Sequence, residues 1–327
     1  MKDTYLKLVI RFGTCLFIFL LGLGFFACEK IETIDLLMEE QSTDTSRAIN
    51  DILFVDDSTG YAVGGAVWEQ GIWLLTQNGG ASWQLFEEGD KMLMAIDQDE
   101  QGNIYTTGLS GQLLKLDQDD RSWKELFQVY KLFNAVDFWD EDTGVLLGGA
   151  AFQIGYLYHF NEREKTDTLI EVEHEFRDVY YISKNEVFAA GFGRIWRSED
   201  SGKNWSLIPI QGDFFHSIHF PTPEVGYIIG NRGTILKTQD RGVHWEVLRD
   251  SRSIGVEDFP FQKIFFVNEE KGYIVGEQGL FWRTENGGIE WKQIQQAPKL
   301  DYSSIYVVNQ QGWIGTKNGK IFHFVDD

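Results

Sequence analysis

Hydrophobic and polar residues alternate in short runs along most of the chain, and the same arrangement returns every 40 to 46 residues. One copy begins with the apolar run 52–55, passes through an acidic turn and continues in the run 60–64, which Gly60 opens and Gly64 closes. The place of Tyr61 in this copy is taken in the later copies by other apolar residues: Ile104, Val145, Val187, Tyr227, Tyr273 and Trp313. A repeat of this length indicates units that stack against one another.

Each copy predicts four short strands separated by turns. The apolar residues alternate or cluster in fours and show no helical period, which disfavours a helical solenoid. Four strands in a repeat of this size are typical of a propeller blade. The pattern therefore predicts an all-β fold, a single β-propeller of about seven four-stranded blades. Six or eight blades stay open as alternatives, because the third copy is degenerate.

The turn between the third and fourth strands carries the most specific motif, Ser/Thr-x-Asp/Asn-x-Gly-x-x-Trp. The Asp or Asn side chain can bond backbone N–H groups within such a turn, and the Gly accepts a positive φ. The Trp buries a large ring against the neighbouring layer. We expect these residues to stabilise the turns and to have a structural role. The four clean copies are Thr76, Asn78, Gly80 and Trp83; Ser198, Asp200, Gly202 and Trp205; Thr238, Asp240, Gly242 and Trp245; and Thr284, Asn286, Gly288 and Trp291.

The motif resembles the Asp-box, or BNR repeat, of sialidases, xyloglucan-active glycosidases and sortilin-type receptors. Together with the preceding phrase, as in residues 226–230 and 233–245, it looks most like the photosystem II stability/assembly factor family. The resemblance covers about residues 52–327 and is poor in the second and third copies. It implies a seven-bladed ring that assists assembly of a membrane complex, although a photosynthetic role does not follow from a shared fold.

Two stretches outside the clean copies complete the predicted ring. The seventh copy stops after its third strand, and residues 34–37 are expected to supply the missing fourth strand and remove the open edge. The alternative is a disordered tether, since residues 39–47 are polar. We divide the chain into residues 1–27, a signal peptide; residues 28–49, the tether or closing strand; and residues 50–327, the propeller.

The first 27 residues have the features of an export signal. Lys2, Lys7 and Arg11 precede an apolar run that ends with Ala27, directly before Cys28. The ending resembles the lipobox of bacterial lipoproteins, which implies that Cys28 is lipidated and becomes the mature N-terminus. We therefore expect attachment to the membrane of a bacterial cell envelope, most simply the outer membrane. An ordinary cleaved signal or an uncleaved anchor are the alternatives.

Charge and cysteine content argue against nucleic-acid binding and against a fold held by disulfides. The net charge is −21, the opposite of what a nucleic-acid binder needs. The chain has two cysteines, Cys15 in the expected signal and Cys28, so no disulfide framework remains after processing. We expect no cofactor and no metal site. His216 and His219 are three residues apart in a strand and point to opposite faces, so they cannot share a metal.

Function is expected on the face formed by the turns between second and third strands and by the loops between blades. Arginines on an otherwise acidic body predict an anchor for an acidic segment of a protein partner. The alternative is that these residues are solvated turn residues with no role in binding. The candidates are Trp68, Phe192, Arg194, Arg232, Arg249, Arg252 and Lys317.

The sequence names no catalytic residue. A glycosidase needs two facing carboxylates, for which Asp137, Glu173 and Asp258 are weak candidates. No phosphate loop or nucleotide fingerprint occurs. A non-catalytic platform that binds protein is the preferred interpretation, and a carbohydrate-active propeller that hydrolyses or binds glycans is the alternative.

Overall fold

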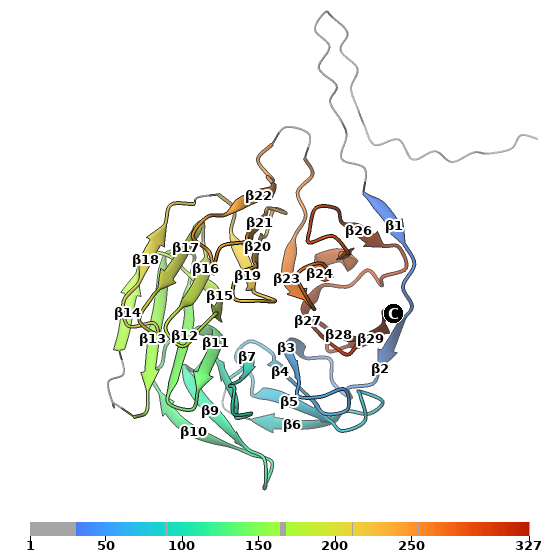
Figure 1. Ribbon diagram of the computed structural model, residues 1–327. Coiled ribbons are helices and arrows are strands. Elements are labelled where there is room, and N and C mark those ends of the chain that lie inside the picture. The colour runs from blue at the N-terminus through green and yellow to red at the C-terminus, as the bar shows by residue number, and fades with distance from the viewer. Residues whose placement is uncertain (1–30, 89–90, 164–167, 211, 254–255, 327) are drawn as a thin grey trace, which may run out of the picture.

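The computed structural model describes residues 31–88, 91–163, 168–210, 212–253 and 256–326. Within these ranges the strands form seven sheets arranged in a ring around a central opening, and the one helix is the short turn η1 (Glu277–Gly279) (Figure 1). The seven-bladed all-β propeller is thus confirmed, and the degenerate third copy still forms a complete blade.

The first four blades take consecutive strands in chain order, from the channel outward. Blade 1 has β3 (Ala48–Phe54), β4 (Gly60–Gly65), β5 (Gly71–Thr76) and β6 (Gln84–Glu88). Blade 2 has β7 (Leu93–Gln98), β8 (Ile104–Gly108), β9 (Gln112–Asp117) and β10 (Ser122–Gln128). Blade 3 has β11 (Phe133–Asp140), β12 (Thr143–Ala150), β13 (Ile154–Asn161) and β14 (Thr168–Val172). Blade 4 has β15 (Phe176–Tyr181), β16 (Val187–Gly191), β17 (Arg194–Ser198) and β18 (Ser206–Ile208).

The last three blades include both strands from the N-terminal segment. Blade 5 has β19 (Phe215–His219), β20 (Gly226–Gly230), β21 (Ile235–Thr238) and β22 (Glu246–Arg249). Blade 6 has β23 (Phe261–Phe266), β24 (Gly272–Gly276), β25 (Phe281–Thr284) and β26 (Lys292–Ile294), with β1 (Glu32–Ile34) added at its outer edge. Blade 7 has β27 (Tyr302–Val308), β28 (Gln311–Thr316), β29 (Ile321–Val325) and, outermost, β2 (Met38–Gln41).

The recurring glycine at the start of the second strand has a packing reason. In blade 5 the ring of Phe220, which follows the inner strand, lies where a Cβ on Gly226 would be, 2.3 Å from the nearest ring atom. Blade 1 repeats this arrangement with Phe54 against Gly60, at 2.5 Å. Only a residue without a side chain lets the aromatic ring cover the sheet at this point. The same contact recurs in blades 3 and 6, with Phe138 against Gly144 and Phe266 against Gly272, so the repeated phrase records one packing contact in four of the blades.

Side chains of the inner strands latch successive blades together around the channel. Asp97 accepts a hydrogen bond from the backbone N–H of Phe138 in the next blade (2.7 Å), and Asp137 accepts one from Tyr181 (2.6 Å). These bonds satisfy buried polar groups on both sides of the blade interface. The other latches of this kind join Asp51 to Ile96, Asp178 to Ile218, and His219 to Phe266.

The ring is closed by the N-terminal segment, but a few residues later than the sequence suggested. Strand β2, not residues 34–37, pairs with β29. Ile34 instead ends β1, which runs parallel to β26 on blade 6. The N-terminal segment therefore adds an outer strand to each of two blades, and we call it the N-terminal strap. Residues 38–41 form a strand, whereas the alternative expectation placed them in a disordered tether. The displacement is understandable, because Ile34 and Leu36 pack against the core of blades 6 and 7, whereas Glu39 and Glu40 are exposed in the edge strand.

Candidate binding face at the channel mouth

The ring has two faces that differ in their loops. The hairpin face carries the Asp-box turns, and the mouth face carries the turns between second and third strands together with the loops that link blades. A channel of about 910 Å³ runs along the inner strands and reaches mouth-face residues, among them Phe152, Phe214, Asn231, Glu277 and Lys317. Propellers and other rings place ligands in such concave openings. The channel mouth is therefore the candidate site.

Carboxylates and Lys263 line the inner part of the channel, and Lys317 lies at its mouth. Burial raises the pKa of Asp97 to about 7 and holds the pKa of Asp137 well above its ordinary value. Burial likewise raises the pKa of Asp51. Burial opposes the charge of Lys263, but the attraction of Asp178 and Asp51 outweighs it, and the pKa of Lys263 is raised. The Lys263–Asp178 pair is thus the charged centre of the channel, beside carboxyl groups that take up protons readily.

His216 and His219 both line the channel, so the expectation that they point to opposite faces was wrong, because the strand has a register shift between Phe215 and Ser217. Both histidines stay neutral at physiological pH. Burial, with the charges of Arg177 and Lys317 nearby, lowers the pKa of His216 to about 3. Burial and Lys263 lower the pKa of His219 to about 3 as well, and its Nδ1 accepts the backbone N–H of Phe266 (3.3 Å). In the described part of the chain no group of three or more His, Cys, Asp or Glu is arranged to hold a metal ion.

Three phenylalanines gather at the mouth, which we call the aromatic cup: Phe152, Phe192 and Phe214. Their ring centroids lie 5.4 to 5.5 Å apart, and the Phe214 ring stands at 84° to Phe152 and 72° to Phe192. Phe152 and Phe192 nevertheless remain 49% and 44% exposed. Large rings that are packed together and still open to solvent are typical of protein contact sites.

A buried carboxylate holds the cup in place. Glu175 accepts the backbone N–H of Phe152 (2.9 Å) through one oxygen and pairs with the Arg177 guanidinium (2.7 Å) through the other. The same guanidinium lies 5.1 Å from the centre of the Phe214 ring. Phe152 has a positive φ of 62°, a conformation that a bulky residue adopts only when its surroundings enforce it. The exposed position of this ring is therefore built into the loop.

The predicted mouth-face residues fall into separate groups. Phe192 belongs to the aromatic cup, and Lys317 lies at the channel mouth, paired with Glu277 (2.8 Å). Trp68 stands alone on blade 1, 79% exposed at a φ of 69°, with the Lys91 amine 5.6 Å from its ring. Arg194 begins β17.

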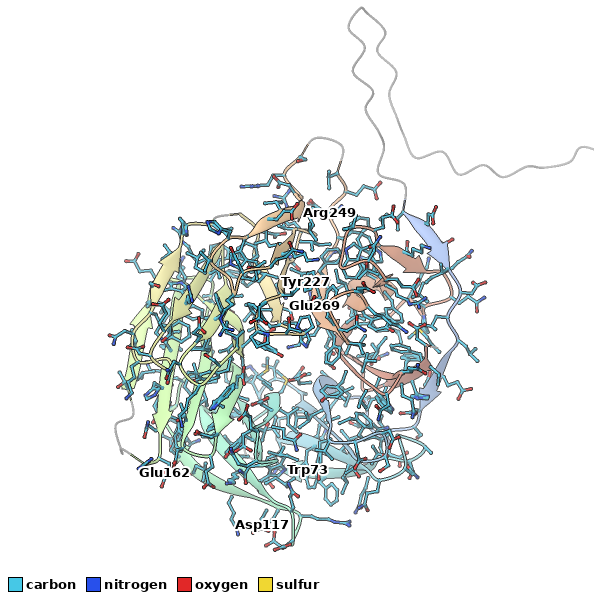
Figure 2. All side chains as sticks on the ribbon, viewed as in Figure 1. Trp73, Asp117, Glu162, Tyr227, Arg249 and Glu269 are labelled. Atoms are coloured by element: carbon cyan, nitrogen blue, oxygen red, sulfur yellow. The ribbon has the colours of Figure 1, made fainter. Side chains whose placement is uncertain are left out.

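The remaining arginines of the predicted cluster belong to blade 5 and its outgoing loop, and each meets an acceptor there. Arg249 lies at the end of β22 (Figure 2) and is buried. It donates to the carbonyls of Gly233 and Glu257 (both 2.6 Å) and lies 4.8 Å from the Phe259 ring. Arg232 pairs with Asp258 (3.1 Å), and Arg252 pairs with Asp250 (3.0 Å). The arginines of blade 5 and its outgoing loop are thus hydrogen-bonded or ion-paired to acceptors of the same blade and loop.

The three carboxylates named as a glycosidase alternative lie in different settings. Asp137 is inside the channel, Asp258 is on the loop after β22 with Arg232, and Glu173 is exposed on the loop after β14. A hydrolytic pair needs two carboxyl groups about 5 to 10 Å apart around one cleft. These three residues do not line one cleft together.

The four Asp-boxes share one hydrogen-bond pattern. In blade 5, Thr238 Oγ1 accepts the N–H of Gly242 (2.9 Å) and donates to Asp240 (2.9 Å), which accepts the N–H of His244 (2.8 Å). The equivalent bonds recur in the other three boxes. All four lie on the hairpin face, away from the aromatic cup.

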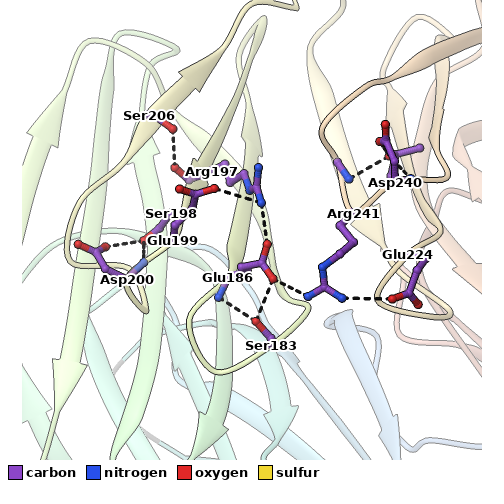
Figure 3. A network of polar contacts seen from close by, with 12 residues as sticks. Ser183, Glu186, Arg197, Ser198, Glu199, Asp200, Ser206, Glu224, Asp240 and Arg241 are labelled. Atoms are coloured by element: carbon purple, nitrogen blue, oxygen red, sulfur yellow. Dashed lines mark hydrogen bonds and ion pairs between the residues drawn. The ribbon is translucent and has the colours of Figure 1, made fainter.

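One Asp-box also ties two blades together. Arg241, the residue between Asp240 and Gly242, reaches across to Glu186 of blade 4 and to Glu224 (3.3 Å) of its own blade (Figure 3). Glu186 in turn pairs with Arg197 (2.6 Å). This network on the hairpin face stabilises the blade 4–5 interface.

Sequence reasoning missed Phe152, Glu175 and Arg177. All three lie in or beside the degenerate third copy, where no motif marks the strand ends. The only sequence signal is the strand period, which places Arg177 next to the inward-facing Asp178.

The chain is similar to known proteins in sequence and in fold. A family model described as photosynthesis system II assembly factor YCF48 matches residues 207–326. The structure of YCF48 bound to D1 peptide aligns with a TM-score of 0.70 at 18% identity, covering 91% of this chain and 100% of that one. The chain is a YCF48-like, BNR-type β-propeller.

Other solved structures share the fold with this YCF48-like propeller. YCF48 from Cyanidioschyzon merolae aligns with a TM-score of 0.67 at 12% identity, over 88% of this chain and 98% of that one. The WD40 propeller domain of Doa1 aligns at 0.69 and 14% identity, over 90% and 98%. None of the curated proteins matches the sequence. Identities this low establish the architecture alone.

Proposed function

We propose that this propeller is a non-catalytic platform that binds a protein partner on its mouth face, in the manner of an assembly factor. The observation that carries the proposal is the aromatic cup, because Phe152 and Phe192 stay about half exposed although each is packed against other rings. The family match and the likeness to a YCF48 structure that holds a peptide support a protein partner.

The channel carboxylates are better explained by the fold than by hydrolysis. Asp97 and Asp137 each accept a backbone N–H of the next blade, so their positions are required by the ring itself. A catalytic acid needs a carboxyl free to reach substrate. A glycan-active propeller is therefore the second choice, and it is tested in the same experiment.

We further propose that lipid on Cys28 attaches the ring to a bacterial envelope membrane, with the outer membrane as the first choice. The signal and Cys28 lie outside the described residues, and no helix in the described ranges is long and apolar enough to cross a bilayer. Strand β1 starts beside Lys292, directly after an Asp-box turn, so the N-terminal segment leaves the ring near the hairpin face. Two residues lie between Cys28 and Ile31, and the three Cα–Cα steps that join them span at most about 11 Å. Such an anchor turns the mouth face away from the lipid.

The test compares envelope protein capture by three forms of the tagged lipoprotein, purified under mild detergent. We expect the wild type to retain a defined protein at a constant ratio, Phe152→Asp to lose it, and Ile289→Asp on the hairpin face to keep it. Ile289 is a matched control because it is 74% exposed. Equal capture by all three forms, or release of reducing sugar from envelope glycans by the pure protein, contradicts the proposal.

A further inference from the structure

We infer that the aromatic cup receives one bulky, uncharged apolar side chain from an extended segment of the partner protein. The inference rests on the proposed function and specifies its chemistry. It departs from the expectation that arginines would draw an acidic segment.

The charges at the mouth are the first argument. Arg177 is paired with Glu175, Lys317 is paired with Glu277, and burial keeps His216 neutral. The charges of these two pairs therefore cancel, on a chain whose net charge is −21. An acidic or basic group that enters between these pairs would lose hydration and meet cations and carboxylates that already have partners. An uncharged side chain meets no such cost.

The shape of the cup is the second argument. Phe214 stands nearly perpendicular to both other rings, so the three rings form walls and offer no flat platform. Sugar rings stack on flat aromatic faces, whereas an inserted aliphatic or aromatic side chain contacts faces and edges together. Phe152 and Phe214 also border the channel, which leaves depth for a side chain to enter. Both features favour a protein side chain over a glycan.

The backbone supplies the third argument. Ala151 and Phe152 both have positive φ, 54° and 62°, and Glu175 clamps the Phe152 N–H. A loop that served only as a connection would relax this strain with glycine. Holding a phenylalanine here pre-organises the contact and lowers the entropy lost on binding.

The test uses the exported chain carrying Cys28→Ser and fluorescent nine-residue peptides, acetylated and amidated, with Gly/Ser flanks and one central residue. Measured by anisotropy, central Trp or Leu is expected to bind at least 10-fold more tightly than central Asp or Lys. Affinity is expected to change less than 2-fold between 50 and 500 mM salt, because no net charge is involved. Preference for Asp or Lys, or a 10-fold loss in high salt, overturns the inference.

Variants locate the contact. Phe152→Ser and Phe192→Ser are each expected to weaken the Trp peptide at least 5-fold, Phe152→Leu to restore most of the affinity, and Ile289→Ser to have no effect. Phe152→Gly, which suits the positive φ, keeps the fold intact and gives a second loss-of-binding variant. Unchanged affinity in the Phe152 variants, or binding of soluble oligosaccharides in place of peptides, overturns the inference. Partner capture that persists in Phe152→Ser but is lost in Phe152→Asp overturns this inference alone, whereas equal capture by Phe152→Asp and wild type, or absence of any captured protein, overturns the proposed function.

Discussion

The Lys263 amine lies 3.3 Å from both carboxylate oxygens of Asp178, although the two residues belong to blades 6 and 4. The pair reaches past blade 5, so it joins blades that are not neighbours in the ring. Asp178 also accepts the hydroxyl of Ser217 (2.8 Å) and the N–H of Ile218 (2.9 Å) of that intervening blade. One carboxylate thus connects three consecutive blades around the channel.

Removing the lysine leaves this carboxylate buried without its counter-charge. Lys263→Met is expected to lower the free energy of unfolding by about 3 kcal/mol, the range found when one partner of a buried pair is lost. Denaturant unfolding followed by tryptophan fluorescence measures the change. The double variant Lys263→Met with Asp178→Asn serves as control and is expected to recover part of the loss. A single variant as stable as wild type would show that the channel pair is not structural.

The elevated pKa of Asp97 makes stability depend on pH in an unusual direction. Its pKa rises from 3.8 to about 7 on folding because of burial, so the folded protein holds a proton that the unfolded chain releases between these values. Stability from this group is therefore present below pH 4 and is lost as pH rises through 7. One pKa unit corresponds to about 1.4 kcal/mol, and because Asp97 is only partly buried, solvent screening reduces the total effect to about 1–2 kcal/mol.

Asp97→Asn removes this dependence while keeping an oxygen to accept the Phe138 N–H. We expect the variant to be more stable than wild type at pH 8 and equal to it at pH 4, in thermal unfolding measured at both values. An advantage that is the same at both pH values would mean that Asp97 is already ionised in the folded state.

Two glycines with positive φ allow the cost of backbone strain to be measured apart from the cost of steric crowding. Gly242 of an Asp-box has a φ of 75°, and a Cβ there would lie 2.4 Å from the Phe188 ring of the preceding blade. Gly193 has a φ of 65° with nothing within 4 Å. Gly193→Ala is expected to cost about 1 kcal/mol from the backbone alone. Gly242→Ala is expected to cost about 3 kcal/mol, since overpacking adds to the strain. An equal loss of unfolding free energy in both variants would show that close packing of Gly242 against Phe188 of the preceding blade does not contribute to stability.

The N-terminal strap is expected to hold blades 6 and 7 together. Ile31, Ile34, Leu36 and Met38 pack against their cores. Starting the chain at residue 42 removes these contacts, for a loss of roughly 4 kcal/mol. The midpoint of thermal unfolding should fall by roughly 10 °C.

Leu37→Ser is the control for the strap, because Leu37 is 71% exposed. It should leave the midpoint unchanged, and adding a synthetic peptide of residues 31–47 to the shortened chain should restore part of the loss. A shortened chain with an unaltered midpoint would contradict the closure described here.

The architecture was predictable because the apolar strands recur in every blade and the glycine and the Asp-box turn recur in most of them. The closing strand was displaced by four residues, since polar Glu39 and Glu40 suit an edge strand that only a completed sheet can reveal. The aromatic cup was only partly predictable. Phe192 follows a recognisable second strand, but Phe152 lies in a copy whose motif is lost. The Lys263–Asp178 pair depends on ring curvature, which no local pattern encodes.

Site-specific photo-crosslinking in intact cells tests most directly the claim that the mouth face binds the partner. A photoreactive phenylalanine analogue would replace Trp68, Phe192, Val243 or Ile289 one at a time, all of them exposed. The account predicts a defined protein adduct from Phe192, with Trp68 as the outer limit of the contact, and no adduct from Val243 or Ile289 on the hairpin face. Adducts from the hairpin-face positions with none from Phe192 would contradict it.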